Sequence, residues 1–83
     1  MKVLYFAWLK EKIGMSEEEV VLPAAVTTVS DLLGWMRGRG PGFAAALADG
    51  NAVKVAVNHV YAQLKDPVSD TDEVAFFPPV TGG

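Results

Sequence analysis

The C-terminal end of the sequence is the part whose residue types and spacing fit a chemical role. Its last six residues are Pro78, Pro79, Val80, Thr81, Gly82 and Gly83. The two prolines and the two β-branched residues favour an extended backbone, and the two glycines carry no side chain. Fully extended, six residues span roughly 20 Å at about 3.3–3.6 Å each. This pattern predicts a stiff arm with a slim tip, able to place a terminal carboxylate in a narrow channel.

No other group of residues predicts catalysis by the chain itself. The single His59 fits a turn, and no partner that would complete a triad or a metal site is evident. Asp70, Asp72 and Glu73 resemble a fragment of a calcium-binding loop, but the remaining ligand spacing is missing. The chain has no cysteine, which excludes disulfides, zinc–thiolate sites, iron–sulfur clusters and thiol nucleophiles. We therefore expect no metal site and no cofactor bound by the chain itself.

Length and composition predict one small globular domain. The 83 residues are 51% hydrophobic and 20% charged, which is ordinary for a folded domain of this size. The chain contains seven basic and ten acidic residues, and its net charge is therefore −3. This acidic balance argues against nucleic-acid binding. No apolar run approaches the roughly 18 residues of a membrane span, and the N-terminus lacks the cleavage region of a signal peptide. We expect a cytoplasmic protein with no membrane partner.

Hydrophobic patterning predicts the elements that must carry the arm. Strands are expected over residues 2–9, 18–22, 53–57, 60–64 and 73–77, with Asn58-His59 as a tight turn. The run Glu17-Glu18-Glu19 fits a solvated strand start better than a metal site. A short helix is expected over 43–48, closed by Asp49-Gly50-Asn51, after a loop over 39–42.

The clearest helix is expected over residues 28–37. Its apolar face has helical spacing and consists of Val29, Leu32, Leu33 and Met36. Thr28 can cap its N-terminus, and Gly38 can take the left-handed conformation that ends a helix. Gly34, inside the helix, would allow close packing because it lacks a side chain.

The order of these elements predicts an α+β fold. Two strands, one main helix and further strands suggest a mixed sheet with the helix across one face, and the β-grasp arrangement fits this order. The first two strands would form a hairpin, and a later strand would lie parallel to the first. We expect a β-grasp domain over residues 1–77 and an extended tail over residues 78–83 that ends in Gly-Gly.

Strand parity predicts a contact surface at the base of the arm. Val74 and Phe76 share one face of the last strand, and Phe77 points to the other. If Phe76 is in the core, Phe77 is on the surface beside the arm, where burial against a partner would contribute about 2–3 kcal/mol. Trp8 and Trp35 are expected in the core or at its edge.

The terminal segment also carries a resemblance to a known family. Residues 72–83, which read DEVAFFPPVTGG, resemble the C-terminus of the MoaD family, the small subunit of molybdopterin synthase. Residues 2–7 resemble the first strand of that family, and Val57-Asn58 matches it as well, with the same spacing to the end. The resemblance covers essentially the whole chain, and only the middle is generic.

The resemblance implies a ubiquitin-like β-grasp sulfur carrier that is not catalytic alone. An E1-like enzyme such as MoeB would use ATP to adenylate Gly83, and sulfur would then displace AMP to leave a thiocarboxylate. The tail would insert into a MoaE-like large subunit, in a heterotetramer, and donate sulfur to precursor Z (cyclic pyranopterin monophosphate). Phe77, Tyr61 and Phe6 match positions where family members use apolar residues to bind the partner, although Phe6 and Tyr61 could also be core residues.

Elementary chemistry agrees with this role. A carboxylate is a poor electrophile because its leaving group is oxide, whereas an acyl adenylate has a good leaving group, and the activating enzyme can stabilise the charge that develops. Without cysteine, transferable sulfur must sit on the chain terminus or on a partner. Three alternatives stay open: a sulfur carrier for thiamine, cysteine or tRNA thiolation; a ubiquitin-like modifier joined through Gly83 to a lysine; and a passive interaction module with a frayed tail.

Overall fold

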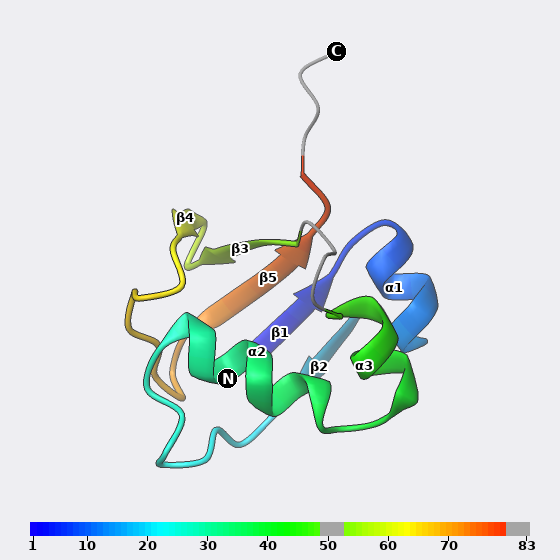
Figure 1. The fold of residues 1–83 in the computed structure, drawn as a ribbon. Helices are drawn as coiled ribbons and strands as arrows, with labels where there is room; N and C mark the ends of the chain where they lie inside the picture. Colours follow the sequence, from blue (N-terminus) through cyan, green and yellow to red (C-terminus); the bar gives the residue numbers. More distant parts are fainter. Residues whose placement is uncertain (49–52, 80–83) are drawn as a thin grey trace.

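The computed structural model describes residues 1–48 and 53–79. Within these residues the chain forms a five-stranded sheet and three short helices (Figure 1). In chain order the elements are β1 (Lys2–Tyr5), α1 (Trp8–Ile13), β2 (Glu17–Glu19), α2 (Val29–Arg37), α3 (Pro41–Ala46), β3 (Lys54–Val57), β4 (Val60–Ala62) and β5 (Glu73–Phe77).

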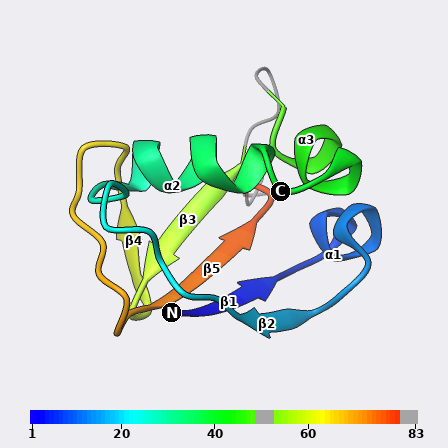
Figure 2. The same ribbon diagram turned by 90° about the horizontal axis from the view of Figure 1, so that it is seen from below.

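The sheet is mixed, with strand order β2-β1-β5-β3-β4. The central strands β1 and β5 are parallel, and every other neighbouring pair is antiparallel. The three helices lie on the same face of the sheet, and the other face is left uncovered by them (Figure 2). This confirms the predicted α+β fold, including the hairpin of the first two strands and the parallel pairing of the last strand with the first.

Helix α2 forms where local sequence signals predict it. The Thr28 side chain accepts a hydrogen bond from the Asp31 N–H at 3.1 Å, and the Asp31 carboxylate accepts one from the Thr28 N–H at 3.3 Å. The Thr27 backbone N–H, with further hydrogen bonds, lowers the pKa of Asp31. The apolar face that the sequence predicted for α2 is buried against the sheet. Two glycine predictions are wrong: Gly38 is right-handed at φ −79°, and Gly34 makes no close packing contact, because a Cβ added to it would meet nothing within 4 Å outside its own helix backbone.

The segment after β1 differs from its prediction. The strand expected over residues 2–9 ends at Tyr5, and α1 occupies Trp8–Ile13. Ala7 has φ 55° and ψ −134°, a conformation that ends the strand. Leu9 is then fully buried, and Gly14 closes the helix with φ 94° and an N–H bond to the Lys10 carbonyl. Burial of Leu9 against the core outweighs the strand propensity of this run.

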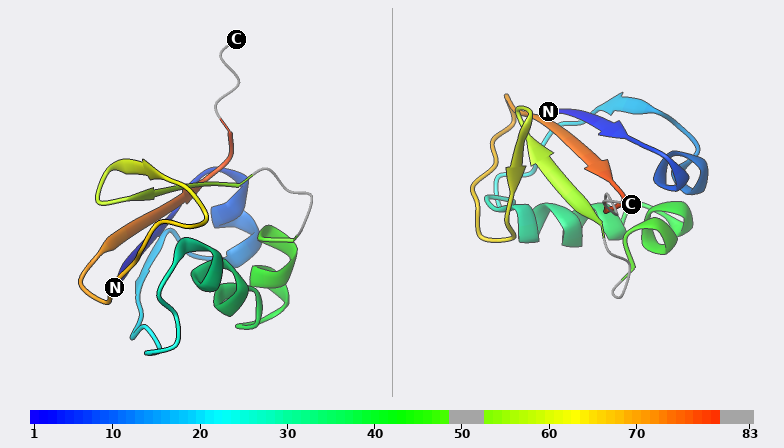
Figure 3. Two further views of the ribbon diagram at one scale, coloured as in Figure 1. Left: turned by 60° about the vertical axis from the view of Figure 1, so that its left-hand side comes forward. Right: turned by 90° about the horizontal axis from the view of Figure 1, so that it is seen from above.

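Other boundaries also moved: β3 begins at Lys54 rather than at residue 53, and α3 ends at Ala46 rather than at residue 48. The second strand covers Glu17–Glu19 rather than 18–22, and the fourth ends at Ala62 rather than at residue 64. Helix α3 begins at Pro41, a residue suited to a first helical turn, although 39–42 was expected to be a loop. α1 and α3 lie side by side (Figure 3), and a Cβ on Gly42 would stand 2.6 Å from the Lys12 carbonyl oxygen. The predicted closing turn Asp49-Gly50-Asn51 lies outside the described residues.

The core lies between the sheet and the helices and holds β5 in place. Phe76 is fully buried, and its ring stacks on Tyr5 at a centroid distance of 6.0 Å. Tyr5 in turn meets Phe43 of α3 edge-on at 6.2 Å. Trp8 and Trp35 pack at the edge of this core, as predicted. β5 lies in the middle of the sheet, and Phe76 near its end is fully buried. The core therefore fixes the position from which the following residues begin.

Candidate functional site: the sheet face at the base of the tail

The uncovered face of the sheet is apolar near the end of β5. Strand register places Ala75 beside Leu4 on β1 and beside Ala56 on β3, and Ala56 pairs with Tyr61 on β4. Paired residues share a face, and Phe77 shares the face of Ala75 because the two are two residues apart. The opposite end of this face is charged, because Lys2 forms ion pairs there with Glu17 and Glu73 at 3.7 and 3.9 Å.

The structure places all three predicted partner-binding residues around the end of β5. Phe77 is half-buried and points away from the core residue Phe76, as parity predicted. The Tyr61 ring lies 5.7 Å from the Phe77 ring and is 74% exposed. Phe6 is 49% exposed, and its N–H donates to the Phe76 carbonyl at 3.1 Å. The alternative that Phe6 and Tyr61 are core residues is therefore wrong.

The tail begins at this surface. Pro78 and Pro79 follow β5 directly and are half-buried. Val80, Thr81, Gly82 and Gly83, which include the predicted site of activation, lie outside the described residues. β5 ends at Phe77, where the domain boundary was predicted; the boundary itself stays a prediction.

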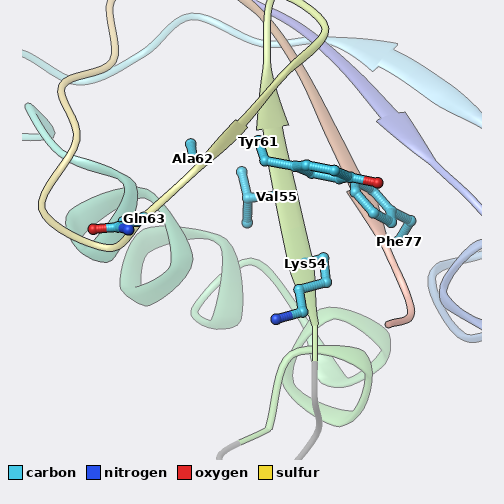
Figure 4. A pocket seen from close by; sticks show the side chains of 6 residues that line it. All are labelled: Lys54, Val55, Tyr61, Ala62, Gln63 and Phe77. Atoms are coloured by element: carbon cyan, nitrogen blue, oxygen red, sulfur yellow. The ribbon is translucent and has the colours of Figure 1, made fainter. Parts of the chain in front are cut away.

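A hollow of about 380 Å³ adjoins Tyr61 and Phe77 on this side of the molecule (Figure 4). It is lined by Lys54, Val55, Tyr61, Ala62, Gln63 and Phe77. Sequence reasoning missed Lys54 and Gln63 as part of the site. The alternation of Lys54 with two valines marks only an ordinary exposed strand position, so the sequence carried no signal for it.

Away from this surface, a polar cluster joins β2 to the loop after α2. Arg39 donates from both terminal nitrogens to the Glu18 carboxylate at 2.7 and 2.8 Å, and the Tyr5 hydroxyl donates to it at 2.6 Å. The Arg39 guanidinium also lies over the rings of Trp35 and Phe43, at 5.3 and 4.6 Å. Glu18 is therefore anchored, and the prediction that the whole acidic run is a solvated strand start is wrong at this residue.

This cluster shifts the pKa values of its members. Hydrogen bonds from Arg39 lower the pKa of Glu18, with a smaller lowering from the Tyr5 hydroxyl. Burial raises the pKa of Tyr5 well above its ordinary value, assisted by the Glu18 carboxylate. At neutral pH the cluster is thus a carboxylate, a guanidinium and a neutral phenol, which suits a structural clamp.

The clamp predicts a pH dependence of stability. The pKa of Glu18 is lower in the folded chain than in the unfolded chain, so the unfolded chain binds more protons below about pH 5. The stability that Glu18 contributes is full above its ordinary pKa and is lost as the pH falls through the lowered folded value. We expect the free energy of urea unfolding to drop more steeply between about pH 5 and pH 3 in the wild type than in Glu18→Gln. Glu19→Gln, an exposed change on the same strand, should follow the wild type; equal slopes for wild type and Glu18→Gln would contradict the clamp.

The described residues contain no cluster of three or more histidine, cysteine or acidic side chains placed to hold a metal ion. Among the helices of residues 1–48 and 53–79, none is long and apolar enough to cross a membrane.

Comparison with known proteins places the chain among sulfur carriers. The ThiS family matches residues 3–83. The molybdopterin synthase sulfur carrier subunit of Escherichia coli is 43% identical over 83 residues, covering 100% of this chain and 99% of that protein. The Haemophilus influenzae protein of the same name is 36% identical with the same coverage. Among solved structures, SAMP1 from Haloferax volcanii superposes with a TM-score of 0.78 at 31% identity, covering 100% of this chain and 98% of that one.

These matches agree with the sequence and the geometry. The structural match confirms the ubiquitin-like β-grasp fold that the order of elements and the resemblance predicted. Because the family match runs from the first strand to the last glycine, and both curated relatives span the full chain, the chain belongs to the ThiS family and is related throughout its length to molybdopterin synthase sulfur carrier subunits.

Proposed function

We propose that this chain is the sulfur carrier subunit of a molybdopterin synthase, with Gly83 as the residue that is activated and charged with sulfur. The observation that carries the proposal is the 43% identity to a sulfur carrier subunit over all 83 residues. The family match also extends to residue 83 and so includes both terminal glycines.

The geometry supports this role. β5 lies between β1 and β3 in the sheet, and its end is held by the buried Phe76. The tail starts from that end, beside the exposed rings of Tyr61 and Phe6. A protein that accepts the tail must lie against the residues at its base, so one apolar surface would serve both docking and tail delivery.

The proposed chemistry occurs at the terminal carboxyl group of Gly83. One carboxylate oxygen attacks the α-phosphorus of ATP, and pyrophosphate leaves, which forms the acyl adenylate. Hydrosulfide, which is sulfur at the sulfide oxidation level, then attacks the acyl carbon, AMP leaves with the electron pair of the broken C–O bond, and the S–H proton is released to solvent. The resulting thiocarboxylate carries the sulfur to cyclic pyranopterin monophosphate. The activating enzyme binds ATP and stabilises the developing charge, so the carrier itself supplies only the acyl group.

The proposal implies two protein partners and no resident cofactor. A MoaE-like large subunit would take up residues 78–83 in a heterotetramer and would bind Phe77, Tyr61 and Phe6. A MoeB-like, E1-type enzyme would carry out the adenylation with ATP, and we propose that this takes place in the cytoplasm. The chain alone would show no turnover; with the large subunit it would form a sulfurtransferase.

Intact mass spectrometry tests the proposal. After incubation with ATP, the E1-like enzyme and a sulfur donor, we expect the chain to gain about 16 Da, the difference between sulfur and oxygen. The same mixture without ATP should leave the mass unchanged, since the adenylate cannot form. An unchanged mass under conditions that charge the Escherichia coli subunit would refute the proposal.

A ubiquitin-like modifier is the second candidate, and the match to a solved structure of the small archaeal modifier protein 1 of Haloferax volcanii, with a TM-score of 0.68 at 26% identity, favours it. Activation at Gly83 would be alike, but the acceptor would be a lysine amine rather than a sulfur nucleophile. Protein adducts joined through Gly83, detected on an epitope-tagged chain in cells, would support this candidate. Carriers for thiamine, cysteine or tRNA thiolation differ only in the acceptor and would be distinguished by which product forms.

A further inference from the structure

The hollow beside the tail exists because the edge strand is shorter than its neighbours. β4 ends at Ala62, opposite Val55, whereas β3 and β5 continue to the pair Lys54 and Phe77. The side chains around the gap thus come from three strands and from Gln63, which follows β4 (Figure 4). Its apolar part consists of Val55, Ala62 and the rings of Tyr61 and Phe77.

Among the described residues that line the hollow, Lys54 is the only one that carries a charge. Its side chain is exposed, and within residues 1–48 and 53–79 no ion pair or hydrogen bond links its ammonium group to another residue. Lys2 and Arg39, by contrast, are both paired with glutamates of β2. Lys54 therefore adds a positive charge, unpaired within the described residues, to a hollow whose other described lining residues are uncharged.

The position of the hollow indicates what must cover it. Phe77 is part of its wall and is also the residue from which Pro78 and Pro79 continue the chain. A protein that takes up the tail approaches along this segment and comes to rest on the hollow. Burial of an unpaired ammonium group is costly, whereas a carboxylate placed opposite it compensates for that cost.

We propose that Lys54 selects the tail-receiving partner by charge: the large subunit presents an aliphatic or aromatic side chain that enters the hollow, with an Asp or Glu carboxylate beside it that pairs with the Lys54 ammonium. This inference rests on the proposed function and deepens it, because it assigns a specificity-determining residue of the carrier outside its tail. Attraction between the two charges accelerates association and weakens with added salt.

Binding kinetics between the full chain and the large synthase subunit encoded in the same genome test the inference. We expect Lys54→Glu to weaken binding about tenfold at about 50 mM salt, mainly through slower association, with most of the difference gone at about 500 mM. Lys54→Arg keeps the charge and should stay within about twofold of the wild type. Lys65→Glu makes the same change in net charge at an exposed lysine that does not line the hollow, and it serves as the matched control.

The outcomes separate this inference from the function on which it rests. If Lys54→Glu binds like Lys65→Glu, or binds more tightly than the wild type, charge selection by Lys54 is wrong although the carrier role stands. If the folded wild-type chain neither binds the large subunit nor gains sulfur, both are wrong. Melting temperatures of all variants should match the wild type, because the Lys54 side chain is exposed and carries no hydrogen bond to the described residues.

Discussion

A chain shortened by Gly82 and Gly83 is expected to fold normally and to carry no thiocarboxylate. The deletion leaves Thr81 as the terminus, with a branched side chain where a slim tip is needed, and retracts the carboxylate by about 7 Å. A narrow channel built for glycine would not admit this end. Intact mass after incubation with ATP, activating enzyme and sulfur donor should stay at the value of the shortened chain.

The thermal unfolding curve of the shortened chain is the control for this experiment. Four residues separate the two glycines from the last strand, and every core residue that the structure describes precedes them in the sequence. The melting temperature should therefore equal that of the full chain. A shortened chain that supports sulfur transfer as well as the full chain would mean that the terminus is not the site of activation, as the passive-module alternative requires.

Two adjacent phenylalanines are expected to respond to alanine substitution in opposite ways. Phe76 is fully buried and stacks on Tyr5, so Phe76→Ala should lower the free energy of unfolding by about 3–5 kcal/mol. Phe77 is half-buried on the opposite face, where Tyr61 is its aromatic neighbour. Phe77→Ala should change stability much less but weaken binding to the large subunit by about 2–3 kcal/mol, or roughly 30-fold to 150-fold.

Urea unfolding and calorimetric titration with the large subunit measure the two effects separately. Phe76→Ala is the matched control for Phe77→Ala, because both remove the same aromatic group one residue apart. Tyr61→Ala should weaken binding in the same direction as Phe77→Ala, since its ring adjoins that of Phe77. Normal affinity of a folded Phe77→Ala variant would show that the partner does not bind this surface.

Local patterns were enough to predict several elements. The bounds of β5 and the opposite directions of Phe76 and Phe77 follow from alternation along a strand, which is a property of neighbouring residues. The start of α2 follows from the hydroxyl and carboxylate of Thr28 and Asp31, which bond to backbone groups within three residues. The turn at Asn58-His59, with φ 50° and 70°, was recognisable because asparagine tolerates positive φ.

The prediction for residues 6–13 shows where local patterns stop being informative. A run of apolar and aromatic residues suits a buried strand and a short buried helix equally well. The choice depends on Ala7, which turns the chain at φ 55°, and on the packing of α1 against α3 across the small Gly42. The residue type of Ala7 gives no sign of its positive φ, and Gly42 lies outside the run, far along the chain.

Some features of the candidate site could likewise be predicted from the sequence, and others are set only by the tertiary structure. The outward direction of Phe77 is a linear feature that the sequence by itself determined, because it follows from alternation along a strand. The extended tail and Gly83 as its tip are also predicted from linear features and stay predictions. Together with the family resemblance they led to the sulfur-carrier hypothesis. The tertiary structure alone decided that Tyr61 meets Phe77, that Lys54 borders a hollow at the base of the tail, and that Glu18 pairs with Arg39. These residues are brought together by strand register and helix packing, which depend on contacts between distant segments and leave no mark in any local pattern.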